Sequence, residues 1–247
     1  MTFNDNEKIK ENIIKYFPHE LRTPLMPILN YSSYLFKEAE ILGVDEIKDI
    51  AKTIERSGLR LLNRIEKFLI LIELESIDVF SDLFQCDALF DSEFVTKLIS
   101  NVLIGCDNHN QFNIQIQSTI LKIHAHFLSV LLSEIIENAC KFSIKDTIIK
   151  INGCYIFNKY KISITNIGCG MSSDEIDSLQ TFIQFNREEN NQGGNGVGLG
   201  IANKIIKLFN CEIELISEKN NFFTVVIYFP LQQNDALNNG LAINSGC

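Results

Sequence analysis

Three groups of residues in this sequence could carry chemistry, and the first is centred on a histidine. His19 is followed directly by Glu20 and, after one helical turn, by Thr23. A neutral imidazole has an ordinary pKa of about 6.5 and is therefore available as a nucleophile at neutral pH. Glu20 is placed to hydrogen-bond this imidazole, and Thr23 shares its helical face. The simpler alternative is that Glu20 and Thr23 are only solvated helix surface.

The second group is a set of polar side chains in the segment SEIIENACKFS. Glu134, Asn138 and Lys141 recur at intervals of four and three residues, which places them on one face of a helix. A carboxylate, an amide oxygen and an ammonium group suit Mg²⁺ and phosphate, because Mg²⁺ prefers a few protein oxygens together with phosphate oxygens and water. An ordinary amphipathic helix is the alternative.

The third group is a glycine-rich run that follows the polar stretch EENNQ. Its members are Gly194, Gly196, Gly198, Leu199 and Gly200. Glycines let backbone N–H groups face phosphates, and a helix that begins near Gly198 adds the positive end of its dipole. The run is not a P-loop, because GKS or GKT is absent, and it does not follow a strand as a dinucleotide fingerprint would. We expect this stretch to form a mobile lid over a triphosphate.

The elements that must position the histidine form an antiparallel helical hairpin. Apolar residues recur at helical spacing from Glu7 to about Glu40 and again from Ile47 to Ile72, with Gly43 in the turn. Two helices cannot bury such stripes alone, whereas two copies of the hairpin close a four-helix bundle. We therefore expect a homodimer, and the alternative is that the stripe packs on the rest of the same chain.

Three prolines surround the histidine within this helical pattern. Pro18, Pro24 and Pro27 each remove a backbone hydrogen bond, at a cost of about 3 kcal/mol or more in a helix interior. Helix propensity alone therefore predicts that the helix ends at these prolines. The alternative is a long helix that bends and leaves His19 prominent.

Beyond residue 80 the pattern changes to short β-branched runs that alternate with helices. This mixture, without strict βαβ alternation, predicts an α+β fold in which an α/β sandwich follows the hairpin. A capping box, Ser172 to Glu175, predicts a short helix from Ser173. Longer helices are expected at about 91–104, 126–142 and 198–209, and strands near 112–117, 119–124, 147–156, 160–166, 211–217 and 222–229. The expected domains are 1–78 and 89–232, joined by a hinge at 79–88 and followed by a disordered tail at 233–247.

Composition narrows the class of protein. The 247 residues are 46% hydrophobic, which is enough for real cores, and a net charge of −9 argues against a nucleic-acid binder. No apolar run of about 18 residues exists, so we expect no direct membrane insertion. The seven cysteines have no metal-ligand spacing, and free thiols in a reducing cytosol explain them best.

The ordered set of HELRTPL at 19–25, ExxxNAxKFS at 134–143 and GNGVGLG at 194–200 resembles the catalytic core of a two-component sensor histidine kinase. The resemblance covers about residues 10–230 and implies a dimerisation and phosphoacceptor hairpin followed by a Bergerat-type ATP-binding domain. It favours the bent helix and implies that His19 is the phosphoacceptor, assisted by Glu20. It also implies that Thr23 positions a water molecule for dephosphorylating the partner regulator.

The same resemblance assigns the nucleotide ligands. It implies that Asn138 binds Mg²⁺, that Glu134 assists at the metal or its water, and that Lys141 lies near the phosphates of ATP. NIGCGM resembles the adenine-binding box that usually reads DxGxG, with Asn166 in place of the aspartate and with Gly168 and Gly170 behind it. An asparagine oxygen can still accept a hydrogen bond from adenine, although a neutral contact is weaker than a charged one.

The segment FIQFNRE looks like the phenylalanine-containing box of the family, with Phe185 and with Arg187 approaching the γ-phosphate or solvated on the lid. The proline before His19 and the NxGxGM and FxQFNR patterns look most like kinases of receiver-fused or other soluble systems, often cyanobacterial.

The function that the resemblance implies is ATP-dependent autophosphorylation of His19 in the cytoplasm, followed by transfer to an aspartate on a response regulator receiver domain. An upstream sensor domain or protein would supply the signal. A kinase of this kind can also dephosphorylate its regulator. The alternative is a non-catalytic phosphotransfer or scaffold protein with a lapsed ATP site, which the replacement of the usual aspartate by Asn166 motivates.

Overall fold

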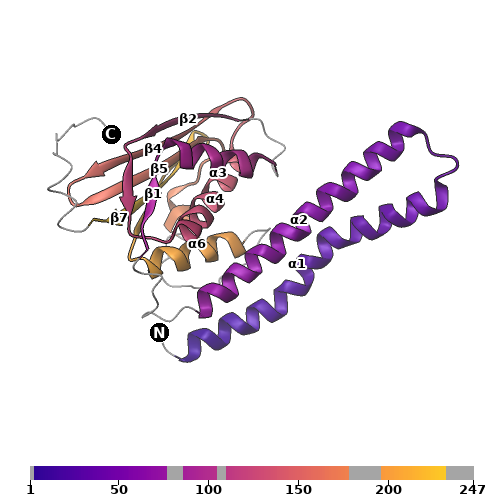
Figure 1. The fold of residues 1–247 in the computed structure, drawn as a ribbon, viewed down its shortest axis with the longest axis horizontal. Coiled ribbons are helices and arrows are strands. Elements are labelled where there is room, and N and C mark those ends of the chain that lie inside the picture. The colour runs from indigo at the N-terminus through magenta and orange to yellow at the C-terminus, as the bar shows by residue number, and fades with distance from the viewer. Residues whose placement is uncertain (1–2, 77–85, 105–109, 178–195, 232–247) are drawn as a thin grey trace. The chain divides into compact units, whose positions relative to one another are not determined.

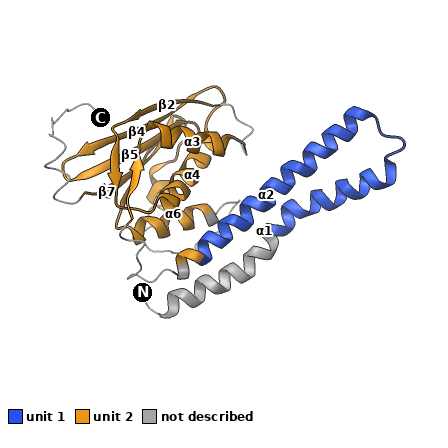
Figure 2. Cartoon of the chain, in the orientation of Figure 1, with its two compact units in different colours: residues 1–72 blue, residues 73–247 orange. Residues whose placement is uncertain are grey.

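The computed structural model describes residues 3–76, 86–104, 110–177 and 196–231, with backbone alone for 3–20, 75–76, 104 and 196–197 (Figure 1). The chain divides into two compact units, residues 1–72 and 73–247 (Figure 2). The expected hinge falls largely on residues 77–85 and the expected tail on 233–247, which lie outside the described residues. The expected domain limits therefore stay predictions.

The first unit is the expected helical hairpin. Helix α1 (Phe3–Glu38) and helix α2 (Val44–Ser76) are joined by a short turn. The Gly43 N–H donates to Glu46 Oε2 at 3.0 Å, which caps the first turn of α2. Helix α1 runs through all three prolines, so the alternative in which they end the helix is wrong.

The second unit is a mixed α/β domain, as the sequence predicts. Its five-stranded sheet has the order β2-β4-β5-β7-β6, in which only β2 and β4 pair in parallel. A second, two-stranded sheet pairs β1 with β3. The strands are β1 (Ala88–Phe90), β2 (Gln111–Ile116), β3 (Thr119–Leu121), β4 (Ile148–Ile156), β5 (Lys159–Ile167), β6 (Glu212–Glu218) and β7 (Phe222–Pro230), and the labelled helices are α3 (Ser92–Ile104), α4 (Ala125–Phe142) and α6 (Gly196–Leu208).

The core of this unit lies between the larger sheet and its helices, which cover one face (Figure 1). Alternate residues of β5 are buried, including Tyr160, Ile162 and Ile164, because successive side chains of a strand point to opposite faces. Leu131 of α4 and Ile205 of α6 are fully buried. The sheet and the two helices thus form the rigid base of the candidate site.

The structure also bears on the expectations about the cysteines and about membrane insertion. Cys169 and Cys211 have free thiols, but Cys154 is disulfide-bonded, so the prediction of free thiols is wrong at that position. The pattern of spacings carries no information on which cysteines approach each other in space, and this is why the pairing was missed. In the described part of the chain, every helix is too short or too polar to cross a membrane.

Candidate functional site

Helix α4 positions the polar group that begins with Glu134. The His124 side chain caps the helix, with Nδ1 accepting from the His126 N–H at 3.2 Å. The sequence analysis did not identify this cap. Glu134 is only 6% exposed, Asn138 is half-buried and Lys141 is exposed. The helical face therefore runs from the core to solvent, with the ammonium group at its outer end.

The start of helix α6 lies directly against Glu134. A Cβ added to Gly198 would lie 2.1 Å from Glu134 Oε2, so a larger residue fits at this position only if the carboxylate moves. Gly198 is itself buried. The structure thus brings together the polar helix and the glycine-rich run, which are far apart in the sequence. The N-terminus of α6, where backbone N–H groups are free of helical partners, begins two residues earlier at Gly196.

Asn166 lies near the end of β5 and faces the helical layer. It continues the buried row of Ile162 and Ile164 and is 3% exposed. Gly168, two residues on, packs closely against its neighbours, because an added Cβ would overlap the Phe142 carbonyl oxygen and lie 3.2 Å from Asn166 Nδ2. Gly168 also forms a β-bridge with Ser143, the C-cap of α4. The asparagine is therefore held next to the end of the helix that carries Glu134.

Gly170 and the capping box form the turn that follows. Gly170 has a φ of 53°, which favours glycine, and its Cα packs against the Glu218 carbonyl. The Ser172 N–H donates to Glu175 Oε2 at 2.8 Å, and the Glu175 N–H donates back to Ser172 Oγ at 3.4 Å. The Ser172 N–H and the Ser172 hydroxyl both donate to Glu175 Oε2, and these two bonds hold the pKa of Glu175 below its usual value. The predicted capping box and the helical turn from Ser173 are confirmed.

The structure does not describe the side chains of several predicted site residues. They are His19 and Glu20, for which the structure gives only the helical backbone, and Phe185, Arg187 and Gly194, which lie in the range 178–195. Thr23 is exposed on α1, one helical turn from His19. In α6, Leu199 is half-buried, and a Cβ added to Gly200 would meet no described atom within 4 Å.

The oxygen atoms that α4 offers suit a magnesium ion better than a metal ion whose ligands all come from protein side chains. Glu134 and Asn138 offer a carboxylate and an amide oxygen one turn apart. No group of three or more His, Cys, Asp or Glu side chains that could hold a metal occurs among the described residues. Mg²⁺ bound through nucleotide phosphates needs only one or two protein ligands.

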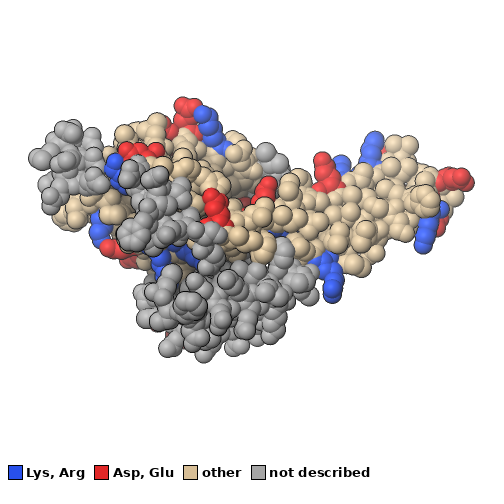
Figure 3. All heavy atoms as spheres, turned by 60° about the horizontal axis from the view of Figure 1, so that its bottom comes forward, with Lys and Arg blue, Asp and Glu red and all other residues tan. Residues whose placement is uncertain are grey.

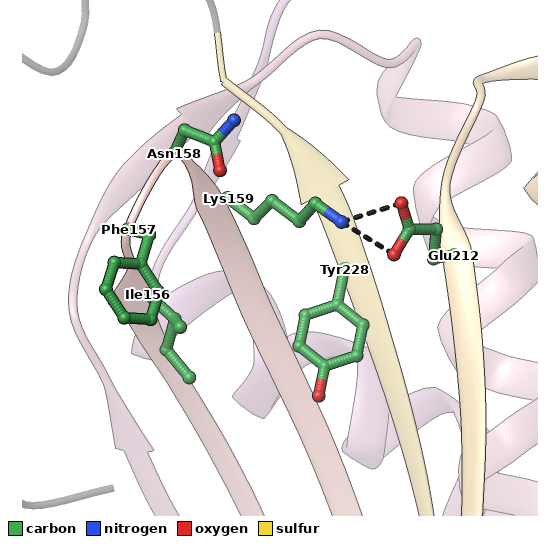
Figure 4. Close-up of a pocket in the computed structure, with 6 residues that line it drawn as sticks. All are labelled: Ile156, Phe157, Asn158, Lys159, Glu212 and Tyr228. Carbon is green, nitrogen blue, oxygen red and sulfur yellow. Dashed lines mark hydrogen bonds and ion pairs between the residues drawn. The ribbon is translucent and has the colours of Figure 1, made fainter.

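A shallow pocket of about 320 Å³ lies elsewhere, at the turn between β4 and β5 (Figure 4). The Lys159 Nζ lies 2.6 Å from both carboxylate oxygens of Glu212, beside the Tyr228 ring. None of the predicted site residues lines this pocket. It is therefore separate from the nucleotide ligands that the sequence predicts.

Comparison with known families matches two domain models to this chain. Residues 9–77 match the His Kinase A (phospho-acceptor) domain, and residues 123–233 match the histidine kinase-, DNA gyrase B-, and HSP90-like ATPase. These ranges contain every residue of the three groups identified in the sequence.

Curated relatives and solved structures agree with this pair of domains. The signal transduction histidine-protein kinase ArlS of Staphylococcus epidermidis RP62A is 27% identical over 93% of this chain, and that of Staphylococcus aureus USA300 is 29% identical over 92%. The chain spans about half the length of these relatives, 49% in each case. The histidine kinase AdeS of Acinetobacter baumannii has a similar fold, with a TM-score of 0.62 and 18% identity over 87% of this chain and 98% of that one. Full-length ShkA in complex with AMPPNP gives a TM-score of 0.57, with 19% identity over 89% of this chain and 45% of that one.

Proposed function

Because the chain belongs to the two-component sensor histidine kinases, we propose that it uses ATP to phosphorylate His19 and then passes the phosphoryl group to an aspartate of a response regulator receiver domain. The observation that carries this proposal is the packing of Gly198 on the Glu134 carboxylate. A chain that had lost its nucleotide site would have no need for a glycine at that position, because a larger residue is favoured in a helix.

In the first step, a ring nitrogen of His19 attacks the γ-phosphorus of ATP. The bond from that phosphorus to the oxygen bridging to the β-phosphate breaks, and ADP leaves with the electron pair. Glu20 hydrogen-bonds the imidazole and stabilises the positive charge that develops on the ring. Phosphoryl transfer of this kind depends mainly on alignment and charge neutralisation.

The ATP domain would supply that alignment through four kinds of group. Asn138 and Glu134 would hold Mg²⁺, which when bound neutralises charge on the phosphates. Lys141 lies at the solvent end of the same helical face, where an ammonium group can reach a phosphate oxygen. The free N–H groups at the start of α6 would bind the phosphates, and Asn166 would bind the purine base.

We propose that the chain acts as a homodimer in the cytoplasm, where ATP and receiver domains are available. Both helices of the hairpin expose large apolar side chains, and the described part of this surface is largely uncharged in Figure 3. These residues include Leu25, Leu29, Phe36, Leu62, Ile65 and Leu69. A second hairpin would cover them in a four-helix bundle. An upstream sensor would act through this bundle, with 79–88 as the hinge.

The test is incubation of the purified full chain with γ-labelled ATP. We expect a phosphoprotein whose label is lost in acid and retained in base, as phosphohistidine requires. His19→Gln should abolish the label while leaving ATP binding unchanged, because the substitution lies in the other domain. Label on the variant would refute the assignment of His19, and no binding of Mg-ATP at millimolar concentration would favour the scaffold alternative.

Regulator phosphatase activity is a second candidate, which the exposure of Thr23 one turn from His19 favours. A hydroxyl at this place could orient a water molecule toward a phosphoaspartate. Thr23→Ala should then slow regulator dephosphorylation and leave autophosphorylation intact. Equal rates for Thr23→Ala and the wild type would exclude this role.

A further inference from the structure

The turn that follows α4, residues 143–147, connects the helix of the proposed metal ligands to strand β4. Its side chains are mostly exposed, since Ile144 is 55% exposed and Lys145 and Asp146 also face solvent. Asp146 has a φ of 65°, which is uncommon for a residue with a side chain. Apolar packing therefore does little to fix this turn, and its geometry depends on hydrogen bonds.

Backbone hydrogen bonds tie this turn to both parts of the candidate site. The Ser143 N–H donates to the Ala139 carbonyl oxygen at 3.0 Å, where α4 ends. The Ile144 N–H donates to the Ile167 carbonyl oxygen at 2.9 Å, and Ile167 directly follows Asn166 in β5. The turn is therefore the point at which the helix of the proposed metal ligands meets the strand that carries Asn166.

The side chain of Asn110, the residue before β2, joins two carbonyl groups of this turn. Its amide nitrogen donates to the Ile144 carbonyl oxygen at 3.4 Å and to the Thr147 carbonyl oxygen at 3.3 Å. The residue is 6% exposed, and its amide oxygen is inaccessible and has no hydrogen-bond partner in the described part of the chain. A buried polar atom without a partner is costly. We therefore attribute the presence of an asparagine here to the two hydrogen bonds that its nitrogen donates.

We infer that Asn110 is a positioning residue of the nucleotide site, which fixes the end of α4 against β5 and so sets the distance between the metal ligands and Asn166. The inference rests on the proposed function, because it requires one nucleotide to contact both elements. A nucleotide that binds α4 through its phosphates and β5 through its base gains affinity from this alignment, since the second contact forms within an already bound molecule. A ligand that contacts only β5 gains nothing from it.

The test compares Mg-ADP, which would contact both elements, with AMP, which lacks the β-phosphate of the metal subsite. Asn110→Asp keeps the size of the side chain, but an ionised carboxylate only accepts, so both hydrogen bonds to the turn are lost. For the full chain with this substitution, we expect the dissociation constant of Mg-ADP, measured by titration calorimetry, to rise about tenfold. The dissociation constant of AMP, measured by NMR titration, should change by less than about twofold. A residue that served stability alone would leave both constants of the folded protein unchanged.

Asn113→Asp is the matched control, because it adds the same charge at an exposed position three residues on, in β2, and both constants should equal those of the wild type. Asn110→Ala is the second variant, which removes both hydrogen bonds without burying a charge. It should show the same selective loss of Mg-ADP affinity, and it decides the question if thermal unfolding shows that Asn110→Asp does not fold.

Two results overturn the inference and leave the proposed function standing. One is wild-type affinity for Mg-ADP in a folded Asn110 variant. The other is an equal loss of affinity for Mg-ADP and AMP, which would show damage to the base subsite instead of lost alignment. If the wild type does not bind Mg-ADP at millimolar concentration, the proposed function fails, and the inference fails with it.

Discussion

Substitution of Gly198 by alanine tests whether the contact between α6 and α4 serves phosphoryl transfer. The added methyl group would lie 2.1 Å from Glu134 Oε2 and 3.1 Å from the carboxyl carbon. Ordinary contact begins at about 3.4 Å, so the carboxylate must retreat by more than about 1 Å. Glu134 is 6% exposed, so we expect the displaced carboxylate to move within the site, away from the position in which it would assist the metal.

The size of the effect follows from this displacement. A misplacement of about 1 Å in a catalytic constellation costs roughly a hundredfold in rate. Alanine is the better helix former by about 1 kcal/mol, so the substitution should not unfold α6. We therefore expect Gly198→Ala to lower the autophosphorylation rate about a hundredfold while the melting temperature changes little.

The assay measures the initial rate of His19 labelling from γ-labelled ATP, together with nucleotide affinity and thermal unfolding. Gly200→Ala is the matched control, because its methyl group would meet no described atom within 4 Å in the same helix. This control should lose less than about tenfold in rate. Equal losses in the two variants, or a wild-type rate in Gly198→Ala, would refute the steric reasoning.

Three further predictions follow from the contacts of the ATP domain. Gly153→Ala should destabilise the domain by about 1–3 kcal/mol in chemical denaturation, because the new Cβ would lie 2.5 Å from the Tyr160 hydroxyl oxygen; an unchanged midpoint would contradict this. Ser172→Ala should cost about 1 kcal/mol in the same measurement, because the N–H of Glu175 loses its cap, and Ser172→Thr should restore most of it. Burial raises the pKa of the Cys211 thiol to about 12, so iodoacetamide at pH 8 should alkylate the exposed Cys169 first, and equal labelling by mass spectrometry would show that Cys211 is accessible.

Local patterns predicted most of the elements but not all. The hairpin, the capping box at Ser172 and the strands of the larger sheet follow from apolar spacing and turn residues. Strand β1 was missed because three residues, Ala88–Phe90, are too few to show an alternation. Helix propensity taken alone predicts that the helix ends at the prolines, and this is wrong. The motif around His19 indicated the continuous helix that α1 forms.

The candidate site was harder to predict from residue spacing, because its parts are distant in sequence. Spacing within α4 placed Glu134 and Asn138 on one face, but no local rule places Gly198 on the carboxylate of Glu134. Only the resemblance of the ordered motifs to a known family predicted that these residues belong to one site. The position of the buried Ser143 hydroxyl depends on how β5 meets the end of α4, which no local pattern in the sequence determines.

The order of the larger sheet leaves β6 as an outer strand, with a row of backbone groups available to a neighbouring chain. Glu212 of this strand is paired with Lys159, whereas Glu214 and Glu218 project from the strand and are exposed. Their mutual repulsion with the same residues of another molecule discourages edge-to-edge association between copies. The acidic composition of this protein thus discourages association between copies at the margin of the sheet.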